Sequence, residues 1–231
     1  MKYMIFLRPF GRRLHHLWGR PCPPVRLIKD QEATVLIEFA AGLSFFMVLG
    51  FGGAEFINYV TTQTRISQLA LTVADNASRS QTGTVLALPQ MREIDINDIF
   101  KGAELQSSSI DFKLRGKVIL SSLEVNSSGN QFIRWQRCFG NGPFTSSFGT
   151  PSSSLPSSGM GPSTNKIKAA SGTAVMFVEI LYNYDPILYA SWMSPDAKRM
   201  QATAAFQIRD ARDLDSGVTN PSPTATVSRC S

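Results

Sequence analysis

The sequence predicts an α+β protein in which a long N-terminal membrane-spanning helix packs on a small antiparallel sheet. Three observations predict this class. A basic N-terminus precedes a long apolar stretch, apolar residues continue beyond that stretch at helical spacing, and the second half of the chain holds strand-like segments separated by polar loops. With 231 residues, 43% of them hydrophobic, the chain can form a packed core, which excludes a disordered protein.

The net positive charge of the chain comes from an N-terminal tail, residues 1–29. This tail holds seven of the 23 Lys and Arg residues and no Asp or Glu, although the whole chain has a formal net charge of +6. All 17 acidic residues lie after it, together with the other 16 basic ones, so the body of the protein is near neutral. A basic tail beside an apolar stretch is typical of a cytoplasmic flank, and we expect no nucleic-acid partner.

Residues 30–80 predict a transmembrane and extended helix. The uncharged stretch from Phe39 to Ala54 has 16 residues, about 24 Å of helix, whereas a bilayer core needs about 20 residues. Starting the span at Ala33 makes it long enough and places Glu38 at or within the membrane. The positive-inside rule then puts the tail in the cytoplasm and the chain after Tyr59 on the exported side. Beyond the span, one helix face carries Ile66, Leu69, Ala70, Val73 and Ala77.

Two other readings of the apolar stretch stay open. A cleaved signal peptide also has a basic start, an apolar core and small residues such as Gly50 and Ala54, but the helical pattern continues without a break. A buried helix of a cytosolic protein would leave the charge asymmetry unexplained. A second apolar run at 173–193 is not a span, because Glu179, Asp185 and Pro186 interrupt it, so a single-pass protein is expected.

Residues 81–215 predict a periplasmic α+β domain. We expect a turn region at 81–89, a short helix at 95–105, and strands at 109–115, 117–125, 131–137, 173–182 and 204–209. The Ser-, Gly- and Pro-rich segment 138–172 is expected to be a long loop, and residues 216–231 a flexible tail.

Cysteines and histidines limit the chemistry of this domain. Cys138 and Cys230 both fall on the exported side, where an oxidising compartment favours a disulfide between them; two free thiols are the alternative. The only histidines, His15 and His16, lie in the tail, which excludes Ser-His and Cys-His nucleophiles and histidine zinc sites from the domain. We therefore expect no enzyme, cofactor or metal, and a hydrolase using carboxylates is the enzyme alternative.

The start of the helix resembles a pilin-type sequence: a small residue, apolar residues, Glu-Phe, and more apolar residues. More specifically, ATVLIEFAAGLSFFMVLGFGGAEFINYV resembles the opening of TadE-like proteins, from the TadE/TadG group of the Tad (Flp) pilus assembly system. Glu38-Phe39-Ala40 and Glu55 match the shared acidic positions of that opening. A weaker likeness extends to WQRCFG at 135–140, AVMFVEILYNYDPIL at 174–188 and IRDARDL at 208–214.

This resemblance implies a pilin-like fold and a minor pseudopilin or pilus assembly component. It implies a bacterial inner-membrane protein with a cytoplasmic N-terminus and a periplasmic domain, whose partners are the membrane, other pilin-like subunits and inner-membrane secretion platform proteins. A prepilin peptidase would be a further partner if the bond between Ala33 and Thr34 is cut. Ala33 stands where such sites have Gly, so an uncleaved, TadG-like anchor and a cleaved-signal secreted binding protein remain alternatives.

Overall fold

The computed structural model describes residues 31–80, 83, 88–151, 153, 155, 158–188, 191, 193–230. The chain divides into two units, Met1–Gly50 and Phe51–Ser231. The basic tail, residues 1–29, and with it Cys22, His15 and His16, lies outside the described residues. Within the first unit, the described residues form a single helical segment.

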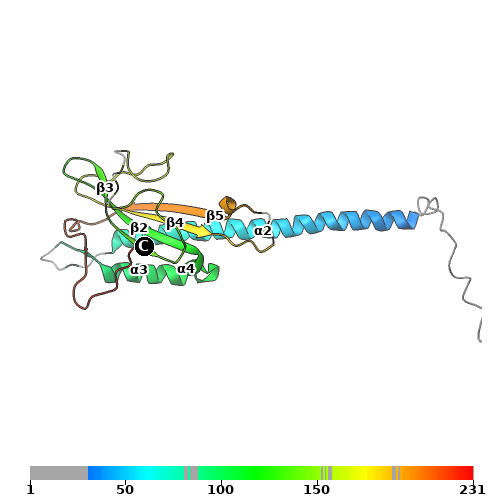
Figure 1. Cartoon of the computed structure of the whole chain (residues 1–231), viewed down its shortest axis with the longest axis horizontal. Helices are drawn as coiled ribbons and strands as arrows, with labels where there is room; N and C mark the ends of the chain where they lie inside the picture. Colours follow the sequence, from blue (N-terminus) through cyan, green and yellow to red (C-terminus); the bar gives the residue numbers. More distant parts are fainter. Residues whose placement is uncertain are drawn as a thin grey trace, which may run out of the picture. The chain divides into compact units, whose positions relative to one another are not determined.

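The long predicted helix is present as α2 (Gln31–Arg79), 49 residues (Figure 1). In the described part of the chain, α2 is the one helix long and apolar enough to cross a membrane, as judged by length and composition. Within the second unit, its predicted stripe is buried, since Ile66, Leu69 and Val73 are at most 1% exposed. This stripe is the helix's contribution to the main core.

A four-stranded antiparallel sheet contributes a further part of that core, together with Ile96, Ile99 and Phe100 of the predicted helix at 95–105. Its order is β3-β2-β4-β5, with β2 (Gly116–Val125), β3 (Gln131–Phe139), β4 (Val175–Asn183) and β5 (Arg199–Gln207) (Figure 1). The central strands β2 and β4 are buried almost throughout, and this burial explains the nearly continuous apolar sequence of β4. The predicted α+β class with a small antiparallel sheet is confirmed.

Short elements complete the second unit. The predicted helix at 95–105 is α3 (Glu93–Gln106), and the remaining elements are β1 (Met91–Arg92), η1 (Ser108–Ile110), α4 (Phe112–Arg115), α5 (Pro195–Lys198) and β6 (Val218–Thr219). The strand β5 begins five residues before the predicted Ala204.

The prediction of a strand at 109–115 was wrong, because this segment forms η1 and α4 instead. Asp111 lies between them with a φ of 48°, a left-handed conformation that an extended strand does not contain. Phe112 is buried and stacks on Phe139 and Tyr182, whereas Leu114 is 70% exposed. The apolar alternation at 110, 112 and 114 therefore reflects one buried anchor rather than one face of a strand.

Residues 216–230, which we call the closing segment, make contacts that were not expected of a flexible tail at 216–231. Its strand β6 pairs in parallel with β1, and the backbone N–H of Cys138 donates to the carbonyl of Ser228 at 2.9 Å. The Asn97 side chain donates to the carbonyl of Thr226 at 2.8 Å. These contacts use mainly the backbone, so a composition rich in Ser, Thr and Pro gave no sign of them.

Candidate functional site

The predicted processing and assembly residues lie at the start of α2. Ala33, Thr34, Glu38 and Phe39 are all helical, and Thr34, Glu38 and Phe39 are exposed. Thr34 and Glu38 are four residues apart, so their side chains share one face of the helix at adjacent turns.

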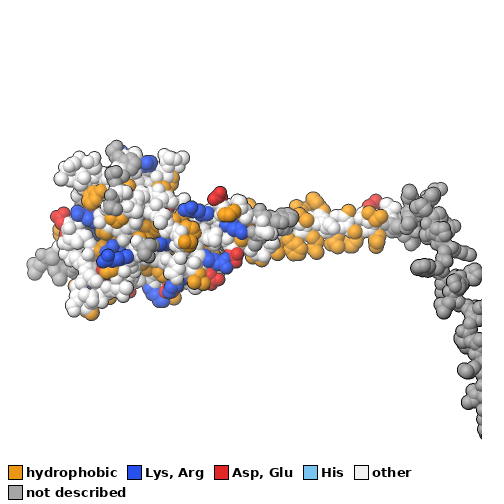
Figure 2. Space-filling model, in the orientation of Figure 1, with side chains coloured by type: hydrophobic (Ala, Val, Ile, Leu, Met, Phe, Trp, Pro, Cys, Tyr) orange, Lys and Arg blue, Asp and Glu red, His pale blue; other side chains and the backbone are white. Residues whose placement is uncertain are grey.

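Exposed hydrophobic side chains follow along α2 (Figure 2). Leu36, Phe39, Phe46 and Val48 are 65–71% exposed, and the helix carries no charge between Glu38 and Glu55. Large apolar side chains on most sides of a helix are unusual for a water-exposed surface and typical of a segment that contacts lipid or other apolar helices.

Glu55 behaves differently from its neighbours, because its side chain turns into the domain. It is only 6% exposed, whereas Phe56 and Ile57 next to it are 68% and 66% exposed. Its Oε1 accepts a 2.5 Å hydrogen bond from the Tyr184 hydroxyl. Its Oε2 accepts 2.9 Å hydrogen bonds from the backbone N–H groups of Ile187 and Leu188. We call this arrangement the Glu55 clamp, since one carboxylate holds the segment after β4 against α2.

Tyr184 is the second member of the clamp. Its hydroxyl also accepts a 2.7 Å hydrogen bond from the side-chain amide of Asn58, one turn beyond Glu55, and its ring packs edge-on against Tyr59. Burial, followed by the hydrogen bond to Glu55, raises the pKa of Tyr184 to about 12. The hydroxyl therefore stays protonated at neutral pH and remains available as a donor to Glu55.

A pocket of about 180 Å³ adjoins the clamp. It is lined by Asn58, Thr62, Ser109, Ile110, Asp111, Arg115, Tyr182, Tyr184, Asp185 and Ile187. Arg115 and Asp185 form an ion pair of 2.6 Å at its edge. The hydrogen bond to Asp185 raises the pKa of Arg115, so this guanidinium stays charged. Asp111 lines the same pocket, so the lining holds two acidic side chains and one basic one.

Sequence reasoning missed three further buried glutamates, Glu93, Glu124 and Glu179. Arg137 donates to the Glu93 carboxylate, and Arg134 donates to Glu124 at 3.1 Å. Glu179 accepts hydrogen bonds from the Ser147 backbone at 3.1 Å and the Gln201 side chain at 2.8 Å. A charged residue inside a predicted buried strand, as at Glu179, was the available signal. Each of these carboxylates holds together elements of its own domain.

The predicted cysteine pair is joined in the structure. Cys138, near the end of β3, and Cys230 form a disulfide with a Cα–Cα distance of 4.9 Å and a sequence separation of 92 residues. The bridge borders a pocket of about 280 Å³ whose lining includes Lys117, Phe144 and Arg229. It fixes the closing segment to the sheet beside this pocket.

Among the described residues, no group of three or more His, Cys, Asp or Glu side chains could hold a metal ion. The chain matches no family model, no curated protein and no solved structure.

Proposed function

We propose that the chain is a membrane-anchored, non-enzymatic component of a Tad/Flp-type pilus assembly system, either a minor pseudopilin or an assembly factor. The observation that carries the proposal is the placement of Glu38-Phe39-Ala40 at the start of a long helix with exposed apolar side chains and no further charge until Glu55. In this proposal, α2 crosses the bacterial inner membrane, the basic tail stays in the cytoplasm and the sheet-containing domain lies in the periplasm.

The proposed mechanism is lateral packing of α2 against the helices of other pilin-like subunits. A carboxylate at the centre of the hydrocarbon costs about 2.5–3.5 kcal/mol on insertion scales, and a positive partner would offset this cost to the extent that Glu38 enters the hydrocarbon. If the chain is cut before Thr34, the new amine lies one helical turn from Glu38, on this chain or on a neighbouring subunit. A pair of this kind between subunits would set the register of their helices.

If the chain is not cut, Glu38 takes a different partner. Lys29 and Arg26 are then the nearest sequence candidates, and the pair would anchor the helix at the cytoplasmic surface. The inner-membrane secretion platform is the further proposed partner, and a prepilin peptidase joins it only if Ala33–Thr34 is a processing site.

A Glu38→Gln variant tests the proposal, because it removes the charge and keeps the shape of the side chain. In cells that carry the pilus system, we expect the variant to reach the membrane fraction and fold, while surface pili are lost. The matched control is Glu104→Gln, which neutralises a partly exposed carboxylate between Lys101 and Lys113 on the domain. Normal piliation with Glu38→Gln would reject the proposed role of the carboxylate.

A further inference from the structure

We infer that the periplasmic domain touches the bilayer through an apolar collar consisting of Phe56, Ile57, Val60, Ile187 and Leu188, and that the Glu55 clamp holds this collar at the lipid surface. The inference rests on the proposed membrane span of α2. It adds a second point at which the protein meets lipid, one that belongs to the folded domain.

The collar consists of exposed aliphatic and aromatic side chains. Phe56, Ile57 and Ile187 are 66–70% exposed, and Val60 and Leu188 are 45% and 47% exposed. Isolated apolar side chains on a surface are ordinary, but these five lie around one level of α2, because the clamp ties the backbone of residues 187 and 188 to residue 55. From residue 55 to residue 60 the helix rises only about 7.5 Å.

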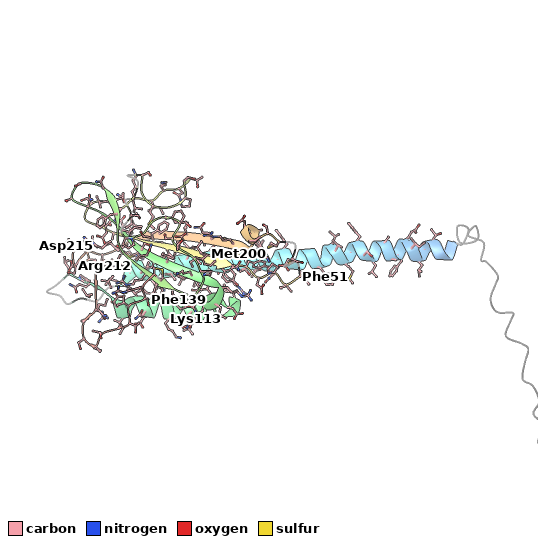
Figure 3. All side chains as sticks on the ribbon, in the orientation of Figure 1. Phe51, Lys113, Phe139, Met200, Arg212 and Asp215 are labelled. Carbon is pink, nitrogen blue, oxygen red and sulfur yellow. A yellow bond between two sulfur atoms is a disulfide. The ribbon has the colours of Figure 1, made fainter. Side chains whose placement is uncertain are left out.

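The level of the collar identifies lipid as its partner. Ala54 is the last residue of the uncharged stretch, and the helical rise from Ala54 to Glu55 is only about 1.5 Å. The headgroup region on each side of the hydrocarbon is about 5–8 Å thick. When Ala54 ends the span, residues 55 to 59 lie about 1.5–7.5 Å beyond it and fall within this region, and Val60 lies at its outer edge. Figure 3 marks Phe51, where the second unit begins, and Arg212 at the opposite end of the domain.

Charges near the collar are compatible with this position. Glu55 would be the acid closest to the hydrocarbon, but its carboxylate is buried and accepts three hydrogen bonds. Asp185 beside the collar is paired with Arg115, and Asp111, which lines the same pocket as Ile187, is a further acid there. The outward surface of α2 is consequently uncharged from Phe39 to Thr64, since Arg65 is the next charged residue after Glu55. The clamp thereby lengthens an apolar surface that the sequence alone ends at Ala54.

The inference can be tested with single thiol labels in the full-length protein, in a Cys22→Ser background that keeps the disulfide. Ile187→Cys, Phe46→Cys and Ser127→Cys are each labelled with a polarity-sensitive fluorophore after reconstitution into phosphatidylethanolamine–phosphatidylglycerol vesicles. Ser127 is the matched control, because it is exposed in the β2–β3 hairpin, at the end of β2 opposite Gly116 and Tyr182. The ten residues of β2 separate these ends by about 30 Å.

We expect the label at 187 to emit at a shorter wavelength in the vesicles, and lipids with a quencher near the headgroup to reduce its emission. The same lipids should leave the emission of the label at 127 unchanged. The label at 46 should be quenched by lipids with a quencher deep in the chain. Quenching at 46 without quenching at 187 would overturn the collar and leave the span standing. No quenching at 46 would overturn the span and the collar with it. Equal quenching at 187 and 127 would also reject the collar, because the domain would then lie on the bilayer without a defined contact.

Discussion

The carboxylate of Glu55 on α2 accepts a 2.5 Å hydrogen bond from the hydroxyl of Tyr184, a residue 129 positions later that follows β4 directly. The same carboxylate holds the backbone of Ile187 and Leu188. Glu55 therefore joins the helix to the central strand of the sheet at the level where the buried stripe of α2 begins. Residues at 55, 62, 66, 69 and 73 form that stripe.

Replacing Glu55 by Gln should destabilise the domain. The Gln side chain has one acceptor oxygen and one NH₂ group. If the oxygen accepts from the backbone N–H groups of Ile187 and Leu188, the NH₂ group faces the Tyr184 hydroxyl, which already accepts a hydrogen bond from Asn58. We expect a loss of about 1–3 kcal/mol, and a larger one for Glu55→Ala, which leaves three donors without their acceptor. Thermal unfolding of the full chain in detergent, with hydrogen exchange of the segment around residue 187, measures both effects.

Glu104→Gln is the control for this experiment. Glu104 on α3 forms ion pairs with Lys101 on the same helix and with Lys113 on α4, and solvent-accessible pairs of this kind contribute about 0–1 kcal/mol. If Glu55→Gln unfolded at the same temperature as the wild type and protected residue 187 equally, the clamp would contribute nothing measurable.

Alkaline pH should weaken the clamp. The folded-state pKa of Tyr184, about 12, lies above the ordinary tyrosine value of about 10, so the folded state holds this proton more tightly than the unfolded state. The resulting stabilisation is complete below pH ~10 and is lost as the pH rises toward ~12. Burial raises the pKa of Tyr182 as well, so the wild type loses stability from both tyrosines.

Tyr184→Phe isolates the contribution of Tyr184. The variant lacks the hydroxyl and is expected to be less stable than the wild type at neutral pH, with a shallower loss of stability between pH 10 and 12. Denaturant unfolding at a series of pH values gives both slopes. An unchanged slope in the variant would mean that Tyr184 titrates alike in the folded and unfolded chains.

Long periodic segments could be predicted from the sequence, and local irregularities could not. The stripe of α2 and the strands β2 and β4 carry strong patterns, because many residues repeat the same burial. The segment at 109–115 alternates like a strand, yet the left-handed Asp111 and the stacking of Phe112 decide its structure. The seven residues alone do not distinguish a strand from this irregular segment, because the deciding contact of Phe112 is with Phe139 on β3.

Several residues of the candidate site could likewise be predicted from the sequence, but most of their contacts could not. The pairing of Cys138 with Cys230 followed from the expected compartment, and the structure joins them. Glu55 was singled out for its spacing from Glu38, but its hydrogen bonds depend on where the chain after β4 returns to α2. That return is a tertiary property, so sequence spacing could identify the residue and not its contacts.

Removing the disulfide should loosen the closing segment. The bridge spans a sequence separation of 92 residues, and the chain-entropy model assigns a loop of this length about 4–5 kcal/mol before any strain. We expect Cys138→Ser with Cys230→Ser to lose most of this stability and to increase hydrogen exchange at residue 138, whose backbone N–H donates to the carbonyl of Ser228. Intact-mass analysis after alkylation without reduction should show one labelled thiol in the wild type, Cys22. Three labels would refute the bridge.

The orientation of α2 is the premise on which the proposed function depends, and the charge asymmetry predicts it. The first 29 residues carry seven basic and no acidic residues, and the positive-inside rule retains such a flank in the cytoplasm. A reporter enzyme that is active only after export should be active when fused after Arg79 and inactive when fused after Lys29. Replacing Arg12, Arg13, Arg20 and Arg26 by Gln should lower the activity of the Arg79 fusion, because the asymmetry falls from seven basic residues to three. Replacing Arg65 and Arg79 by Gln removes the two basic residues between the span and the reporter, and should leave the fusion active. Activity after Lys29 but not after Arg79 would invert the protein in the membrane, and a domain facing the cytoplasm would contradict both the pilus proposal and the oxidising compartment expected for Cys138 and Cys230.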